Sequence, residues 1–261
     1  MSSNDSAIDY LPWDRYLTVI RNETDRLLDV TTDHLDAPVP SCPGWSASDL
    51  LVHVAAVYLD KVENMRLGAD PGVWPSPGLD ESDPVFTLRQ ATGVLLHELQ
   101  DRDPYEERST WYAPDQTNGF WYRRMALEIA IHRLDGELAA TQVTGEPVVT
   151  QIDDDISLDG IDEFLRIMVG GTWADDGMIT KHPVDAVVRV TSSGRSWTLD
   201  VDAAAIEVEE ETEREVGAEI AGTPHDVYAW LWGRGPLDAL SVTGDEDLGP
   251  ELRARFAEAG D

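Results

Sequence analysis

The spacing of apolar residues changes partway along the chain. Up to about residue 169 they recur at three- and four-residue steps, as in Tyr16, Ile20 and Leu27, which is the period of an amphipathic helix. After Gly170–Gly171 come short β-rich runs at 186–190 and 196–201, joined by a turn at 192–195, a pattern typical of a hairpin. We therefore expect an α+β protein, with a four-helix bundle, a connecting helix and a small α/β domain.

The expected helices cover residues 13–34, 46–67, 82–99 and 119–140, with a fifth at 153–169. Further strands are expected at 205–209 and 215–221, and helices at 223–232 and 246–259. The predicted domains are a helical metal-binding domain at 9–172 and a small α/β domain at 180–261.

Charge and cysteine content exclude several classes of function. The net charge of −32 repels phosphate backbones and anionic lipid, so nucleic-acid and membrane binding are not expected. No run approaches the roughly 20 apolar residues of a membrane span, and the polar, acidic start lacks signal-peptide features. We therefore expect a cytoplasmic protein. The single cysteine, Cys42, excludes an internal disulfide and a cysteine-rich zinc motif, and such a residue is more often inert than nucleophilic.

One helix carries a carboxylate and an imidazole on the same face. Glu128 and His132 are four residues apart within an otherwise apolar stripe, so both side chains can reach one metal ion. A bound cation would also remove the cost of burying Glu128. His53, inside the apolar face of the 46–67 helix, is the best third ligand, and three protein ligands leave an open position for water or substrate. The alternatives are an ordinary Glu–His helix pair and a satisfied core histidine.

Several segments, in order along nearly the whole chain, resemble the mycothiol-dependent maleylpyruvate isomerase family. They are Ser-Cys-Pro-Gly-Trp-Ser-Ala-Ser-Asp-Leu-Leu-Val-His at 41–53, Arg-Met-Ala-Leu-Glu-Ile-Ala-Ile-His-Arg-Leu-Asp at 124–135, Gly-Thr-Pro-His-Asp-Val-Tyr-Ala-Trp-Leu-Trp-Gly-Arg at 222–234 and Val-Thr-Gly-Asp at 242–245. The resemblance implies a DinB-like four-helix metal-binding bundle followed by a sterol-carrier-like domain. It also implies Zn²⁺, or another divalent metal, held by His53, Glu128 and His132.

The resemblance further implies a thiol-dependent isomerisation. In the family's founding activity, mycothiol adds to maleylpyruvate, a bond rotates and elimination gives fumarylpyruvate. A metal that binds the thiol would favour its thiolate. The family's functional arginine maps onto Arg234, whose guanidinium can bind a substrate carboxylate bidentately. The alternative is that Arg234 caps a helix. Asp135 could orient His132 but, as a helix-surface aspartate, is left out of the expected site.

The expected function is thus a zinc enzyme that uses mycothiol or a similar thiol, as isomerase or S-transferase, on a small acidic or electrophilic substrate. A metal-dependent hydrolase or amidase would use the same three ligands. A non-catalytic metal-binding protein is the third alternative, and Arg234 argues against it. The expected partners are the small-molecule substrate and the thiol alone, in a monomer or homodimer.

Overall fold

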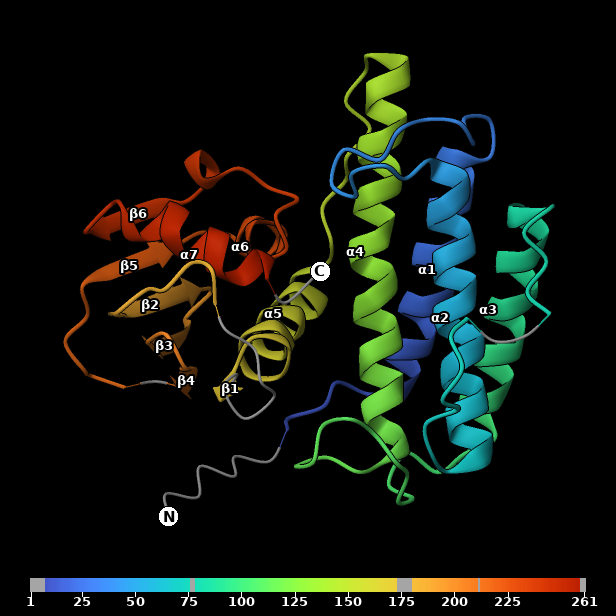
Figure 1. The fold of residues 1–261 in the computed structure, drawn as a ribbon, viewed down its shortest axis with the longest axis horizontal. Coiled ribbons are helices and arrows are strands. Elements are labelled where there is room, and N and C mark those ends of the chain that lie inside the picture. Colours follow the sequence, from blue (N-terminus) through green and yellow to red (C-terminus); the bar gives the residue numbers. More distant parts are fainter. Residues whose placement is uncertain (1–7, 76–77, 173–179, 211, 259–261) are drawn as a thin grey trace. The chain divides into compact units, whose positions relative to one another are not determined.

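The computed structural model describes residues 8–75, 78–172, 180–210 and 212–258. It divides into two compact units, Met1–Thr150 and Gln151–Asp261 (Figure 1). The first is helical and the second combines a sheet with helices, which confirms the α+β class.

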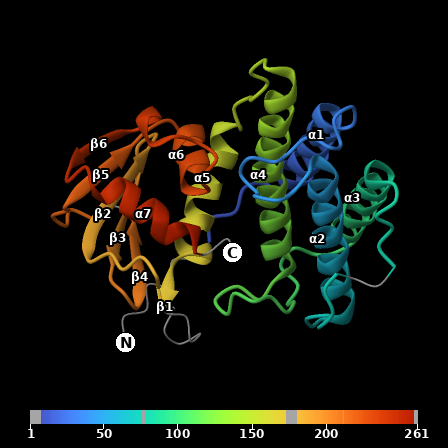
Figure 2. The ribbon, with the colours of Figure 1, turned by 45° about the horizontal axis from the view of Figure 1, so that its top comes forward.

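The N-terminal unit is built from four long helices that run alongside one another (Figures 1 and 2). They are α1 (Trp13–Thr31), α2 (Ala47–Leu67), α3 (Pro84–Gln100) and α4 (Asn118–Thr144). Helix α1 packs mainly on α4, and α2 packs on both α3 and α4. Helices α1 and α4 approach each other closely at Gly136, because a Cβ atom on this residue would lie 2.4 Å from Leu27 Cδ1. The predicted bundle is confirmed.

Helix α4 is buried on most of its surface. Apolar residues such as Met125, Ile129 and Leu134 are almost fully buried, as expected for a central helix. Its charged residues Asp135 and Glu137 are fully buried as well. Buried charges are tolerated only when they are paired, so each of them must have a partner close by.

The C-terminal unit contains a sheet whose described strands follow the order β1-β4-β3-β2-β5-β6. The strands are β1 (Gly171–Thr172), β2 (Ala186–Ser192), β3 (Arg195–Val201), β4 (Ala205–Glu210), β5 (Ala218–Ala221) and β6 (Ser241–Gly244). Neighbours pair antiparallel except β2 and β5, which are parallel. The alternation of buried Val188 and Val190 with half-exposed neighbours shows that β2 has one face in the core.

Among the described residues of this unit, three α-helices cover that core: α5 (Asp154–Glu163), α6 (Pro224–Leu231) and α7 (Leu248–Ala257). Trp197 of β3 donates its indole N–H to Asp162 of α5 over 3.1 Å. Gly160 of α5 lies against the ring of Tyr228 of α6, because a Cβ atom at Gly160 would lie 2.3 Å from Tyr228 Cζ. Helices α5 and α6 are therefore in direct contact. Figure 2 shows all three helices beside the sheet.

The structure differs from the sequence-based expectations at the junction of the units. Helix α5 packs on α6 in the C-terminal unit, so the chain divides after Thr150 and not at the expected boundary near 172. The helix expected at 153–169 ends at Glu163 and continues as a π-helical turn, Phe164–Met168. The short strands β1 and β6 were not expected, and the strand expected at 215–221 begins only at Ala218. The last residue of the helix expected at 246–259 lies outside the described residues.

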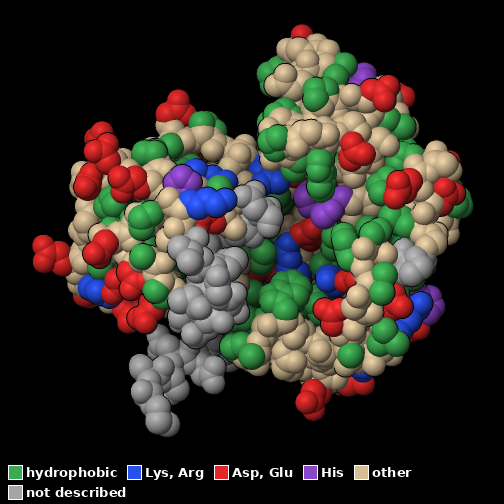
Figure 3. All heavy atoms as spheres, viewed as in Figure 1, with side chains coloured by type: hydrophobic (Ala, Val, Ile, Leu, Met, Phe, Trp, Pro, Cys, Tyr) green, Lys and Arg blue, Asp and Glu red, His purple; other side chains and the backbone are tan. Residues whose placement is uncertain are grey.

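The surface is acidic over both units. Figure 3 shows Asp and Glu side chains spread across the visible face, with fewer Lys and Arg side chains among them. None of the described helices combines the length and the apolar character needed to cross a membrane.

Candidate metal centre

His53 is held near the start of α2 by a well-defined helix beginning. Ser46 caps the helix by accepting from the Asp49 backbone N–H, and the Asp49 carboxylate accepts from the Ser46 backbone in return. This capping box fixes the first turn of α2 and hence the direction of His53 one turn later. The Trp45 and Trp74 rings flank the imidazole, with centroids 4.8 and 6.2 Å away.

Helix α4 brings Glu128 and His132 to the same point. His132 Nε2 lies 3.2 Å from Glu128 Oε1, and His53 Nε2 lies 3.7 Å from the same oxygen. One donor atom from each of the three side chains lies within 4.8 Å of the other two. The structure therefore brings together, from helices α2 and α4, the three residues that the sequence predicted as ligands.

The electrostatics of Glu128 favour the ionised form. Burial by itself would raise the pKa of Glu128, but Arg124 and His132 lower it well below its ordinary value. Arg124 lies one turn earlier on α4 and donates to Glu128 Oε2. That leaves Oε1, which faces both histidines, as the oxygen available to a cation. Sequence reasoning did not single out Arg124, although its i, i+4 spacing from Glu128 was visible.

Asp135 orients His132 from the other side of the ring. His132 Nδ1 lies 2.8 Å from Asp135 Oδ2, and Asp135 is fully buried. An Nδ1–H that donates to this carboxylate leaves Nε2 to face Glu128 and His53. Ser41 donates its hydroxyl to the second Asp135 oxygen, and the Cys42 thiol lies 3.8 Å from the first. The expectation that Asp135 is only a solvated helix-surface residue is thus wrong.

The pKa of His132 reflects the same surroundings. Burial would lower this pKa, but Glu128 and Asp135 raise it to about 9 in protein without a bound cation. At neutral pH this pKa favours the protonated ring, so a metal ion that binds here must displace a proton. In that state the ring donates to both carboxylates.

The donor set fits a divalent transition metal. Two imidazole nitrogens and one carboxylate oxygen are a common ligand set for catalytic zinc. Bonds of the usual zinc lengths in tetrahedral geometry hold donor atoms roughly 3.3 Å apart. The 3.2 and 3.7 Å separations around Glu128 Oε1 are close to that spacing without a bound ion.

A pocket of about 400 Å³ adjoins His53. Its apolar walls include Trp45, Trp74 and Leu79, and Asp49 and Glu81 also line it. No Lys or Arg is among the described lining residues. Since His53 belongs both to this pocket and to the ligand cluster, a molecule in the pocket would lie beside a bound metal.

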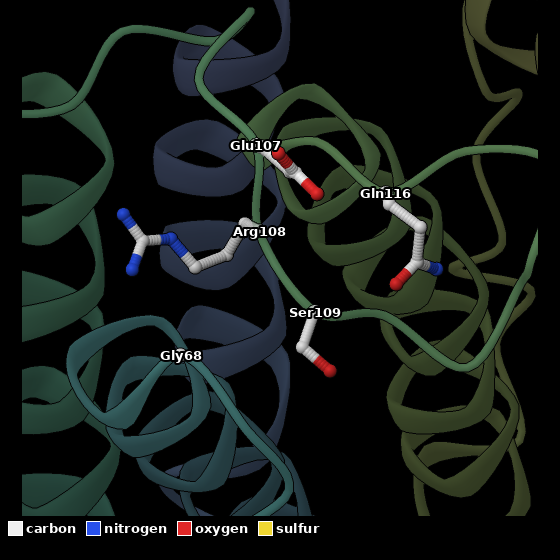
Figure 4. Close-up of a pocket in the computed structure, with 5 residues that line it drawn as sticks. All are labelled: Gly68, Glu107, Arg108, Ser109 and Gln116. Atoms are coloured by element: carbon white, nitrogen blue, oxygen red, sulfur yellow. The ribbon is translucent and has the colours of Figure 1, made fainter.

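A second pocket, of about 350 Å³, lies where the C-terminus of α2 meets the loop before α4 (Figure 4). Figure 4 shows Arg108 directed away from Gln116, so the polar lining groups do not converge. Gln116 already donates to the carbonyls of Thr110 and Tyr112. This pocket holds no arrangement of groups that indicates chemistry.

Arg234 lies in the C-terminal unit, in the turn after α6. The helix ends at its cap residue Trp232, and Gly233 follows with a φ of 73° that suits glycine. Arg234 Nη1 donates to the Trp232 carbonyl over 2.6 Å, and the guanidinium lies 6.0 Å from the Trp232 ring centroid. Because Arg234 and the three candidate ligands belong to different units, its catalytic role stays a prediction.

Comparisons with known proteins agree with this architecture. The family model described as the mycothiol maleylpyruvate isomerase N-terminal domain matches residues 17–136, and its C-terminal domain model matches 155–251. A crystal structure of the mycothiol-dependent maleylpyruvate isomerase is similar over 89% of this chain and 93% of that chain, with 15% identity and a TM-score of 0.59. A histidine-to-alanine mutant of that protein gives the same values.

No curated protein sequence matches the chain. The structural likeness, at 15% identity, establishes the fold alone. The two domain models, however, match consecutive regions that together cover most of the chain, and the first region contains His53, Glu128 and His132. The chain belongs to the mycothiol-dependent maleylpyruvate isomerase family, which is a family of enzymes.

Proposed function

We propose that this protein is a metal-dependent enzyme that uses mycothiol or a similar thiol to isomerise, or to transfer the thiol to, a small acidic or electrophilic substrate. The observation that carries the proposal is the convergence of His53, Glu128 and His132 on one point. Membership of the family supports the thiol and the isomerase activity. Zn²⁺ is the proposed metal because its preferred donors match this set.

In this proposal each residue around the centre has a defined task. His53, Glu128 and His132 hold the metal, and three protein ligands leave a position open for the thiol. Arg124 keeps Glu128 ionised, and Asp135 keeps His132 Nε2 directed at the metal. The metal, when bound, supplies positive charge that favours thiolate over thiol, and the thiol supplies the nucleophile.

The remaining groups act on the substrate or the thiol. Arg234 binds a substrate carboxylate, since a guanidinium can donate two parallel hydrogen bonds to it. The pocket beside His53, with Trp45 and Trp74 in its wall, excludes water and receives the organic part of the thiol. Cys42 takes no part, because the nucleophile comes from the cofactor.

Metal analysis of the purified protein followed by calorimetric titration with the thiol tests the proposal. We expect one zinc per chain, and thiol binding that requires it. His53→Ala and Glu128→Ala should lose the metal with the far-UV circular dichroism spectrum unchanged. His97→Ala is the matched control, because His97 is exposed on α3 and pairs only with Asp101 among the described residues.

Two outcomes would contradict the proposal. Zinc without affinity for the thiol would favour the hydrolase or amidase alternative, in which water takes the open position. Absence of stoichiometric metal after reconstitution, or metal retained in both ligand variants, would remove the metal centre altogether.

A further inference from the structure

The pocket beside His53 has two indole rings in its wall. Trp45 comes from the residue just before the cap of α2, and Trp74 from the segment between α2 and α3. Their ring centroids lie 4.8 and 6.2 Å from that of His53, so both rings adjoin a proposed metal ligand. Trp74 is 54% exposed, although burial of so large an apolar side chain is favourable. Its ring surface is therefore accessible to a ligand in the pocket.

Two carboxylates of the same pocket can accept further hydrogen bonds. The Ser46 backbone N–H and hydroxyl both donate to Asp49 Oδ2, over 2.8 and 2.7 Å. These bonds lower the pKa of Asp49, so its side chain is ionised at neutral pH. Asp49 Oδ1 receives no donor from the described residues, and Glu81 forms no hydrogen bond or ion pair within the described part of the chain. Both side chains are exposed.

The basic residues of α2 do not offset this negative charge. Lys61 pairs with Asp60 over 2.6 Å. Arg66 pairs with Glu98 over 2.7 Å. Neither of them lines the pocket, and His53 is the one basic side chain among the described lining residues. When His53 binds a metal its imidazole is neutral, so the charge that lines the pocket is then negative.

The acidic composition of the chain does not by itself account for this pocket. Among 51 acidic residues, two carboxylates beside a pocket are expected from composition alone. The indole rings are the independent feature, because the face of an indole attracts a cation and repels an anion through the ring quadrupole. Indoles and carboxylates in one wall therefore favour the same sign of charge in a ligand.

We infer that this pocket binds a positively charged ammonium group, and that a substrate carboxylate is bound elsewhere. The inference rests on the proposed function and specifies it, because the organic part of the thiol that enters the pocket then carries the ammonium group. Trp45 and Trp74 supply cation–π attraction, and Asp49 and Glu81 supply negative charge. A divalent metal ion, the Glu128 carboxylate and a thiolate cancel one another in charge, so the centre does not repel the ammonium group.

Calorimetric titration of the zinc-loaded, full-length protein with two thiols tests this inference. Thiocholine and its uncharged carbon isostere neohexanethiol share one shape and differ in a quaternary nitrogen that replaces a carbon. We expect thiocholine to bind about tenfold more tightly. Equal binding of the two thiols, or tighter binding of neohexanethiol, would overturn the inference.

Two variants assign the preference to the pocket. Trp74→Leu keeps an apolar side chain but removes the indole, and Glu81→Gln removes a charge with little change of shape. Each should reduce the preference for thiocholine roughly threefold or more. Glu81→Gln should also leave the affinity for neohexanethiol nearly unchanged, because that thiol carries no charge. An unchanged preference in both variants would overturn the inference.

Glu146→Gln is the matched control. It removes an exposed carboxylate from the same unit, just after the end of α4, and Glu146 is not among the described lining residues of the pocket. Its preference for thiocholine should equal that of the wild type. A reduction as large as in Glu81→Gln would show that the acidic surface as a whole attracts the cation, which would overturn the inference.

A titration without thiol separates this inference from the metal centre. Choline and its carbon isostere neohexanol are added to metal-free protein, and the indole N–H resonances of Trp45 and Trp74 are followed by NMR. Choline should shift both resonances and bind more tightly than neohexanol. This result in a protein that takes up no zinc would support the cationic pocket and contradict the proposed function. Thiol binding that requires zinc but shows no preference for charge would support the proposed function and overturn the inference.

Discussion

Helix α4 carries two clusters of buried charged side chains, and they differ in the groups that pair with the carboxylates. In the first, Arg133 donates to Glu137, to Glu23 and to the Thr150 carbonyl, over 2.6 to 2.8 Å. Arg26 and the Thr150 hydroxyl and backbone N–H complete the acceptor capacity of Glu137. We call this set the Arg133 cluster. Each charge in it has an opposite charge, so the cluster needs no ligand.

The second cluster, made by His53, Glu128 and His132, lies about one turn earlier on α4. Its donor atoms point at one another around Glu128 Oε1. Without a cation, Glu128 and Asp135 raise the pKa of His132 to about 9, so a metal ion that binds at neutral pH must displace a proton from the ring. The comparison teaches that buried carboxylates paired with arginines need no ligand, whereas a carboxylate oxygen that faces two imidazole nitrogens indicates a site at which a metal ion can replace a proton.

The largest expected effect breaks the Arg133 cluster. Glu137→Ala removes the fully buried carboxylate that pairs with both Arg133 and Arg26 and leaves the buried Arg133 guanidinium with Glu23 alone, and we expect a loss of about 3–5 kcal/mol in the free energy of unfolding. Urea unfolding followed by far-UV circular dichroism measures it. Asp101→Ala, which breaks an exposed pair on α3, should cost less than about 0.5 kcal/mol. Similar losses in both variants would contradict the structural role.

For the second cluster, made by His53, Glu128 and His132, we expect a large effect on metal affinity and a small effect on stability. His53→Ala should reduce zinc affinity on the order of 100-fold or more, because one of three ligands is lost. In metal-free protein the same variant should change the free energy of unfolding by less than about 1 kcal/mol, since His53 is partly exposed. Competition with a chromogenic chelator measures the affinity. If His53→Ala lowered the free energy of unfolding but left zinc affinity unchanged, the proposed difference between the two clusters would be wrong.

A smaller effect is expected at the residue that orients His132. Asp135→Asn keeps the shape of the side chain but removes the charge that fixes Nδ1–H, and zinc affinity should fall about 10- to 100-fold. The same chelator competition applies, with Asp101→Asn as the exposed control. An affinity equal to wild type would show that Asp135 does not act on the metal through His132.

The pH dependence of metal binding sharpens the comparison further. Because its folded pKa is raised, His132 stabilises metal-free protein below its ordinary pKa of 6.5 and loses that contribution as pH rises towards about 9. Zinc must displace this proton, so its apparent affinity should rise about tenfold per pH unit between 7 and 8. Titrations in buffers of different ionisation enthalpy count the released protons. Zinc binding without proton release would contradict the arrangement.

Local sequence patterns predicted the elements that depend on neighbours in the chain. The three- and four-residue apolar period predicted the helices of the bundle, and the spacing of Glu128 and His132 predicted the two ligands that come from α4. The place of His53 among the apolar positions of the second helix made it the expected partner from α2, and the resemblance to a family implied the same residue. Strand β6 was missed, because its four residues depend on pairing with β5 and not on their own pattern.

Contacts between distant residues were beyond reach of the sequence. Ser41 meets Asp135 across 94 positions, so the burial of Asp135 had no local signal. Likewise, Arg253 reaches Gly233 only because α7 packs next to the end of α6. The division after Thr150 was also invisible, because α5 has a helical pattern like those of the bundle but buries it against α6.

The most direct test of the metal centre is anomalous diffraction at the zinc absorption edge from crystals of the reconstituted protein. We expect one strong anomalous peak within bonding distance of His53 Nε2, Glu128 Oε1 and His132 Nε2. Absence of a peak there, or a peak bound by other residues, would contradict the account.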